Sequence, residues 1–128
     1  MIFIYTDGSC RYNPGPGAYA WARIEEGKLI SSNFGSCGRI KTTNNRAEMI
    51  AVIEALKTNL DDPITIVSDS HVVVKGATGI WKKRKNKDLW REIDKLTRGR
   101  NIVWKWVKGH NSDRWNDYVD GLAQAGCA

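Results

Sequence analysis

The chain has 128 residues, of which 41% are hydrophobic and 27% are charged. These proportions are typical of one globular domain and exclude a disordered chain. No apolar run approaches the roughly 20 residues of a membrane span. The formal net charge of +6 and the six tryptophans favour a polyanionic partner, or else a basic surface that only maintains solubility.

Three cysteines, Cys10, Cys37 and Cys127, are an odd number without the spacing of metal ligands. They predict neither a zinc site nor a framework of disulfides. Free thiols suit a reducing compartment, and the N-terminus has no basic segment or cleavage site for export. We therefore expect a cytoplasmic protein.

The first half of the chain predicts a strand, a hairpin and a helix. Residues 2–6 are β-branched and aromatic, which indicates a strand. In residues 18–26 and 28–36, on either side of Gly27, apolar and polar positions partly alternate, as in the two strands of a hairpin. Residues 42–59 predict an amphipathic helix of about four turns. Its apolar stripe is Met49, Val52, Ile53 and Leu56.

The second half predicts alternating strands and helices. Residues 63–69 are a short apolar run typical of a strand buried on both faces. Residues 70–78 predict a helix, 88–99 a second helix, 101–109 a strand and 112–125 a last helix. The stripe of the last helix is Trp115, Tyr118, Val119 and Leu122.

This order of elements, a hairpin meander followed by alternating helices and strands, predicts an α/β fold. We expect a five-stranded mixed sheet with helices on both faces. The sequence contains no internal repeat, linker or low-complexity tract. Residues 1–128 are therefore expected to form a single domain.

Three acids stand where one pocket would collect them. Asp7 is predicted to end the first strand, Asp69 the buried strand, and Glu48 lies in the first turn of the first helix. Side chains beyond strand ends converge in such sheets. Converging carboxylates repel one another unless a cation holds them, and oxygen ligands suit Mg²⁺ or Mn²⁺. On a basic surface this predicts phosphoryl-transfer chemistry with two ions.

Each acid also has a structural interpretation. Asp7 and the glycine after it form a common turn dipeptide, and Asn45 with Glu48 fits a capping box. Asp69 fits the cap of the helix that follows it. A helical wheel places Asp120 away from the stripe of the last helix, where a solvated acid is expected. Spacing alone does not choose between these interpretations.

Five segments in order resemble type 1 ribonuclease H: "TDGSC" with "NPGPGAYA", then "TTNNRAE", "SDSHVVVKG", "WVKGH" and "NDYVDGLA". The resemblance covers about residues 3–123. It implies the ribonuclease H-like fold, a five-stranded mixed sheet flanked by helices. It also implies endonucleolytic cleavage of the RNA strand of RNA/DNA hybrids without sequence specificity. The products would carry 5′-phosphate and 3′-hydroxyl ends.

The resemblance assigns roles to five residues. Asp7 matches the first family acid, which would bridge two Mg²⁺ ions, with Mn²⁺ as a substitute; Glu48 and Asp69 match the second and third. Asp120 matches the fourth, where the family typically has Asn-Glu-x-x-Asp-x-Leu-Ala. The resemblance therefore implies that Asp120 is a metal ligand, whereas the helical wheel predicts a solvated acid. His110 of "KGH" matches a loop histidine that assists proton handling or product release.

Further positions correspond to nucleic-acid contacts in the family. Those expected to contact the 2′-hydroxyl are Cys10, Asn13, Asn44 and Asn45. Thr43 and Arg46 would hold backbone phosphates, which positions a duplex without specifying sequence. His71 stands where bacterial members often have a glutamine that reaches the RNA. Capping is the alternative for the two asparagines, and solvent exposure for His71.

The chain departs from well-studied bacterial members in its basic protrusion. Only "GIWKKRKNKDLW" remains, a short form that lacks roughly a helix and a loop. We expect its residues to contact DNA phosphates, with binding that falls steeply with salt; the alternative is a solvated charged turn. These residues are Trp81, Lys82, Lys83, Arg84 and Lys85.

The expected partner is therefore an RNA/DNA hybrid, with no membrane, no obligate protein partner and a monomeric state. Two other functions fit the same residues. A shared fold does not fix the substrate, so a DNA-processing nuclease of this superfold is one alternative. A catalytically weak hybrid-binding module is the other.

Overall fold

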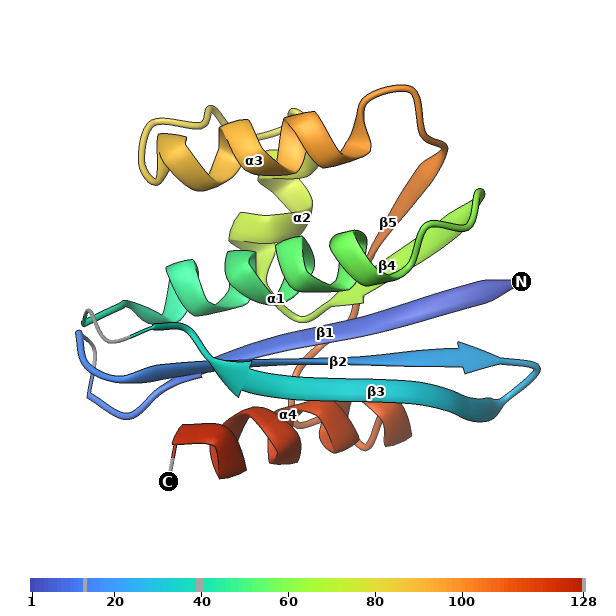
Figure 1. Cartoon of the computed structure of the whole chain (residues 1–128), viewed down its shortest axis with the longest axis horizontal. Coiled ribbons are helices and arrows are strands. Elements are labelled where there is room, and N and C mark those ends of the chain that lie inside the picture. Colours follow the sequence, from blue (N-terminus) through green and yellow to red (C-terminus); the bar gives the residue numbers. More distant parts are fainter. Residues whose placement is uncertain (13, 39–40, 128) are drawn as a thin grey trace.

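The computed structural model describes residues 1–12, 14–38 and 41–127. Its centre is a five-stranded sheet in the order β3-β2-β1-β4-β5 (Figure 1). The strands are β1 (Ile2–Cys10), β2 (Gly17–Glu25), β3 (Lys28–Ser36), β4 (Ile64–Ser68) and β5 (Ile102–Trp106). The pairs β1–β2 and β2–β3 are antiparallel, whereas β1–β4 and β4–β5 are parallel. The mixed five-stranded sheet predicted from the sequence is thus confirmed.

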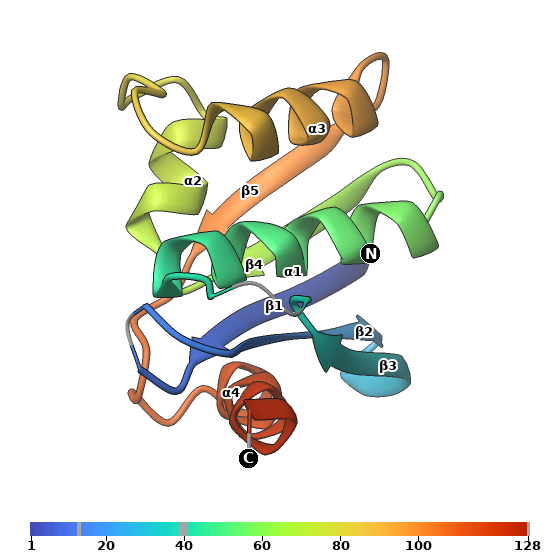
Figure 2. The ribbon, with the colours of Figure 1, turned by 60° about the vertical axis from the view of Figure 1, so that its left-hand side comes forward.

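Helices cover both faces of this sheet, as predicted. They are α1 (Asn44–Thr58), α2 (His71–Ala77), α3 (Lys87–Thr97) and α4 (Arg114–Cys127). Helix α1 lies on one face beneath α3, and α4 lies on the opposite face (Figure 2). In the described ranges no helix has both the length and the apolar character needed to cross a membrane.

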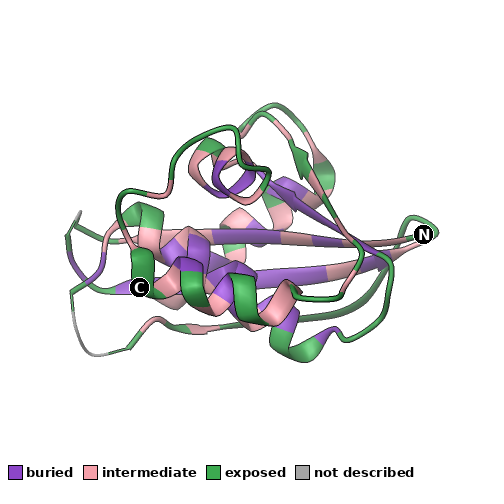
Figure 3. Cartoon of the chain, turned by 90° about the horizontal axis from the view of Figure 1, so that it is seen from above, coloured by how far each residue is buried: buried purple, intermediate pink, exposed green. Residues whose placement is uncertain are grey.

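Two apolar cores lie against the sheet, one on each face. Figure 3 shows that strands and helices both contain buried residues. The larger core joins β1 and β4 to α1, whose predicted stripe of Met49, Val52, Ile53 and Leu56 is buried. The smaller core packs α4 on β2 through small residues, including Ala20, Ala22 and Ala123. All five residues of β4 are buried, as its continuous apolar run predicted.

The structure corrects two predicted boundaries next to the acids. β1 continues to Cys10, because residues 8–10 pair with residues 17–19 of β2. Asp7 therefore lies inside the strand, opposite Ala20, and does not end it. Helix α1 begins at Asn44, so Glu48 is its fifth residue and lies beyond the predicted first turn.

The predicted last strand also ends earlier than expected. β5 stops at Trp106, and the segment that carries His110 is a turn. His110 adopts a positive φ of 53°, which a strand does not accommodate. The histidine therefore lies in the connection between β5 and α4.

Candidate active site

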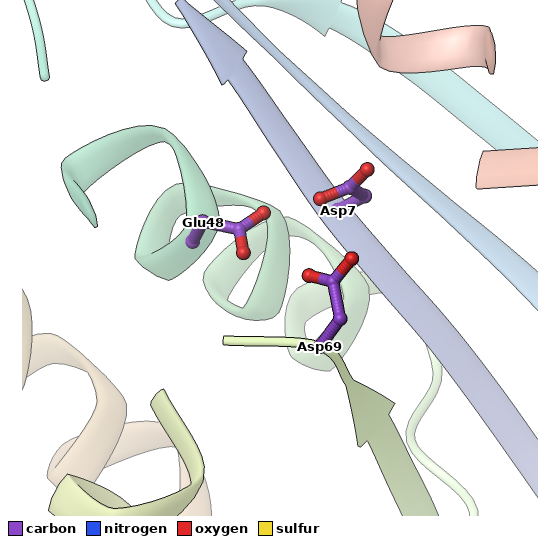
Figure 4. A group of neighbouring side chains, drawn as sticks. All are labelled: Asp7, Glu48 and Asp69. Carbon is purple, nitrogen blue, oxygen red and sulfur yellow. The ribbon is translucent and has the colours of Figure 1, made fainter. Parts of the chain in front are cut away.

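Asp7, Glu48 and Asp69 point toward one another from three different elements (Figure 4). Each offers one carboxylate oxygen, and these oxygens all lie within 4.8 Å of one another. Asp7 comes from β1 and Asp69 directly follows β4, the parallel neighbour of β1. The sheet therefore sets two of the acids side by side, and α1 supplies the third.

Gly8 allows α1 to approach β1 closely enough to deliver Glu48. A Cβ at Gly8 would lie only 2.2 Å from the carbonyl carbon of Ala47, so a larger residue would push the helix away. The backbone N–H of Gly8 donates to Asp7 Oδ1 at 2.9 Å and also to Glu48 Oε1. One amide thus orients two of the three carboxylates.

The capping interpretations of these acids are wrong. Thr43, and neither Asn44 nor Asn45, is the N-cap of α1, and its Oγ1 accepts from the Arg46 N–H at 3.2 Å. Because Glu48 accepts from Gly8, it forms no capping box. Ser70 caps α2 by accepting from the Val73 N–H, which leaves the carboxylate of Asp69 available to the site.

Burial and mutual repulsion raise the pKa values of two acids. Burial, together with the negative charges of Asp69 and Asp120, raises the pKa of Asp7 to about 7, although a hydrogen bond with Glu48 lowers it. Burial and the neighbouring Asp7 raise the pKa of Glu48 well above its usual value. Carboxylates in this state gain from a divalent cation that neutralises them. An all-oxygen ligand set suits Mg²⁺ or Mn²⁺.

Asp120 borders this group from α4. Its charge raises the pKa of Asp7, so the two carboxyl groups are neighbours, although Asp120 is outside the set that lies within 4.8 Å. Its side chain is 26% exposed, and Oδ2 lies 4.0 Å from His110 Nδ1. Gln124 Nε2 donates to the same oxygen at 3.1 Å. Asp120 is therefore half-buried beside the other acids and keeps part of the solvent exposure that the helical wheel predicts.

Three of the predicted 2′-hydroxyl contacts, Cys10, Asn44 and Asn45, are among the described residues. Asn44 and Asn45 line a pocket together with Thr43, Lys85 and Asn86. The Cys10 sulfur lies 3.0, 3.4 and 3.1 Å from the backbone carbonyl oxygens of residues 12, 15 and 42, any one of which can accept its single S–H proton. It thereby ties the end of β1 to the two loops around it. Asn13 lies outside the described residues.

Arg46 is engaged within the protein. Its guanidinium makes two bonds to Asp88, with Nη1–Oδ1 at 3.0 Å and Nη2–Oδ2 at 2.7 Å, and a third to Asn86 Oδ1 at 3.2 Å. Arg46 was predicted to hold a phosphate. Here it fastens the start of α3 to the start of α1.

The short basic segment lines a second pocket with Asn45 and Trp90. The segment consists of Trp81, Lys82, Lys83, Arg84 and Lys85. Lys83 differs from its neighbours because its Nζ lies 3.4 Å from Asp94 Oδ1 and 5.1 Å from the centre of the Trp90 ring. The other four residues are exposed. Four of the five predicted contacts thus face solvent.

Sequence reasoning missed Trp106 and Gly109, which contact Asp69. Trp106 Nε1 donates to the Asp69 carbonyl at 3.0 Å, and its ring stacks on His71. A Cβ at Gly109 would lie 2.7 Å from Asp69 Oδ2. Both residues belong to the quoted segment "WVKGH", but that resemblance does not reveal their contacts with Asp69, which depend on β5 lying next to β4 in the sheet.

Known proteins match the whole chain. The family model described as RNase H matches residues 1–128. A ribonuclease H of Polaromonas naphthalenivorans is 44% identical over 98% of this chain and 86% of its own length. One of Ruegeria pomeroyi is 41% identical over 98% and 91%. Both alignments span 142 positions, so these relatives contain residues that this chain lacks.

Solved structures of similar proteins share the fold. The crystal structure of LC11-RNase H1 in complex with an RNA/DNA hybrid has a TM-score of 0.85 and 26% identity, over 99% of this chain and 96% of that one. The RNase H1 of Halobacterium salinarum has a TM-score of 0.80 and 31% identity, over 98% and 96%. Because the family model covers every residue and both of these relatives exceed 40% identity, the chain belongs to the ribonuclease H family and is an enzyme of that class.

Proposed function

We propose that this ribonuclease cuts the RNA strand of RNA/DNA hybrids without sequence specificity and leaves 5′-phosphate and 3′-hydroxyl ends. The observation that carries the proposal is the convergence of Asp7, Glu48 and Asp69 within 4.8 Å. The similarity to LC11-RNase H1, which was crystallised with a hybrid, supports the choice of substrate.

Asp7, Glu48, Asp69 and Asp120 are the proposed ligands of two Mg²⁺ ions, for which Mn²⁺ would substitute. The raised pKa of Asp7 supports this, because a buried group of acids gains most from a divalent cation. When bound, the ions would supply the positive charge that activates the attacking water and stabilises the leaving oxygen. Asp7, whose carboxyl group interacts with those of the other three, would be one of these ligands.

The protein's own groups would orient these acids and handle the proton. The Gly8 N–H holds Asp7 and Glu48 in place, so little reorganisation is needed when substrate binds. His110 is 80% exposed and lies 4.0 Å from Asp120. From this loop its imidazole would take up or release a proton, or assist product release.

Hybrid recognition is proposed to combine two kinds of contact. The residues proposed to contact the 2′-hydroxyls of the RNA strand are Cys10, Asn13, Asn44, Asn45 and His71. The residues proposed to hold phosphates are Thr43, Arg46, Trp81, Lys82, Lys83, Arg84 and Lys85. Phosphate contacts carry no sequence information, which is consistent with cleavage independent of sequence.

The same proposal includes one domain over residues 1–128 that acts as a monomer in the cytoplasm. The test is cleavage of an end-labelled RNA/DNA hybrid beside double-stranded RNA and double-stranded DNA, with Mg²⁺ or with EDTA. We expect metal-dependent cutting of the hybrid's RNA strand alone. Preferential cutting of the all-DNA duplex would instead support a DNA-processing nuclease.

Asp69→Asn provides the matched control for the metal site. It removes one negative charge from the acid group but keeps nearly the same shape, so fold and hybrid binding should persist. We expect turnover to be lost. A variant that cuts hybrids at the wild-type rate would contradict the metal-site assignment, and binding without turnover in the wild type would indicate a hybrid-binding module.

A further inference from the structure

We infer that Trp106 and Gly109, at the end of β5 and in the loop after it, are positioning residues that hold Asp69 in its ligand geometry. The inference deepens the proposed function and rests on Asp69 being a metal ligand. Its physical basis is three contacts from one short segment to residues 69–71.

The first contact fixes the backbone of Asp69. In the parallel pair β4–β5, Trp106 lies directly opposite Ser68, the residue before Asp69. From there the indole Nε1 donates to the Asp69 carbonyl at 3.0 Å. The Val107 N–H donates to the Ser68 carbonyl, also at 3.0 Å. Two successive carbonyls are therefore held by β5 and the residue after it, which restricts rotation of the peptide that follows Asp69.

The second contact fixes the residue two positions later. The Trp106 ring lies nearly parallel to the His71 imidazole, with ring centres 4.3 Å apart and an angle of 12° between the planes. One side chain therefore bonds the backbone at 69 and stacks on the side chain at 71. Trp106 lies on the edge strand β5 and is 39% exposed. Its role is therefore better explained by these contacts to residues 69 and 71 than by burial in the core.

The third contact limits the carboxylate itself. A Cβ at Gly109 would lie 2.7 Å from Asp69 Oδ2 and 3.4 Å from Cγ. Only a residue without a side chain lets this loop lie against the acid. Because the atoms in the way are the end of a movable side chain, an alanine here would displace the carboxylate rather than unfold the protein.

The contacts from Trp106 and from Gly109 would both affect metal binding by orienting Asp69. Groups that orient a ligand typically contribute 10- to 100-fold in metal affinity. Trp106→Phe keeps an aromatic ring that can still stack on His71, and it removes the pyrrole ring of the indole with its N–H donor. Gly109→Ala keeps the donor and crowds the carboxylate. The two variants therefore disturb Asp69 by independent routes, while the wild-type Asp69 side chain is retained.

The test is Mn²⁺ binding to the nucleic-acid-free protein, measured by titration calorimetry and by the electron paramagnetic resonance of free Mn²⁺. We expect the dissociation constant to rise by about 10-fold or more in each variant. In hybrid cleavage, kcat should fall and KM should stay within about twofold. Trp115→Phe is the matched control, since Trp115 on α4 packs on Tyr118, and it should leave Mn²⁺ affinity unchanged.

Wild-type Mn²⁺ affinity in both variants, or an equal loss in Trp115→Phe, would overturn the inference. A wild-type protein that binds no Mn²⁺ would overturn it as well. Because binding is measured without substrate, the two proposals separate. Mn²⁺ binding that the variants weaken, without any cleavage of hybrids, would contradict the proposed function and leave the positioning role intact.

Discussion

Arg46 and Asp88 form a two-point ion pair between α1 and α3, with bonds of 3.0 and 2.7 Å. Asn86, just before α3, accepts a third bond from the same guanidinium. The pair joins the start of α3, which follows the basic segment at residues 81–85, to α1, the helix that carries Asn45. Asn45 and residues 81–85 line the same pocket, and all of them are proposed to contact nucleic acid. The ion pair therefore fixes the spacing between two proposed contact surfaces.

Loss of this pair should weaken hybrid binding without slowing the chemistry. Asp88→Asn removes the charge that holds Arg46, so residues 81–85 would lose their fixed distance from Asn45. We expect KM for the hybrid to rise about two- to fivefold, the scale of an exposed ion pair, with kcat unchanged. Steady-state kinetics at two salt concentrations would measure both values.

Asp61→Asn is the control for this prediction. It breaks the corresponding pair with Arg23, which lies beyond the far end of α1. KM should therefore stay at the wild-type value. A rise in KM in both variants, or in neither, would show that the Arg46–Asp88 pair has no particular connection to binding.

The stability of the metal-free protein should depend on Asp7 in the neutral pH range. Its folded-state pKa is about 7 against 3.8 for the free group, so the folded protein binds this proton more tightly than the unfolded chain. The stabilisation is fully present below pH 4 and is lost as pH rises through 7. In EDTA we expect Tm to fall by roughly 5 °C or more between pH 5 and pH 8.

Asp7→Asn tests this assignment, because the amide has no proton to lose. The variant should show a flatter dependence of Tm on pH and be more stable than the wild type in EDTA at pH 8. Added Mg²⁺ should stabilise the wild type most at pH 8 and the variant little. The ion pair of Asp88, whose pKa is lowered to about 2, loses its contribution only below pH 4. An Asp7→Asn curve that parallels the wild type would contradict the prediction.

The lysines of the basic segment should differ in how much each contributes to hybrid binding and to stability. Lys82 and Lys85 are exposed, so the double change to alanine should raise KM and reduce the salt slope by about one unit for each phosphate contact removed. Lys83 bonds Asp94 and lies over Trp90. Lys83→Ala should therefore lower Tm more than it changes KM. Equal effects of the three lysines on KM would contradict this difference.

The fold was predictable because its elements have regular patterns. The stripe in α1 and the continuous apolar run of β4 predicted burial that the structure shows. The acids were also identifiable, since Asp69 follows a buried strand. The extension of β1 was missed because Asp7 and Gly8 are residue types with weak strand preference. Pairing with β2 decides their conformation.

What the sequence could not show depends on contacts between distant elements. The approach of α1 to β1 at Gly8, the indole bond from β5 to Asp69 and the engagement of Arg46 by Asp88 join residues 37 to 42 positions apart. Periodicity alone did not bring Asp120 to the other acids, because its neighbour Asp7 lies on another element. A helical wheel compares only residues of one helix, and it assigns such an acid to solvent.

Gly8→Ala should damage both the fold and the acid group. The new methyl group would lie 2.2 Å from the Ala47 carbonyl carbon, and backbone at that distance moves only if α1 shifts away from β1. Overpacking of this kind costs about 1–3 kcal/mol. The shift would also weaken the bond from Gly8 to Glu48. We therefore expect a lower Tm together with Mn²⁺ binding weakened by about 10-fold.

Gly121→Ala is the matched control on α4. A Cβ there meets no atom within 4 Å, and alanine is preferred to glycine inside a helix by up to about 1 kcal/mol. This variant should gain stability and bind Mn²⁺ as the wild type does. A Gly8→Ala protein with wild-type Tm and wild-type Mn²⁺ affinity would show that α1 adjusts without moving Glu48. The close contact at Gly8 would then have no part in assembling the acid group.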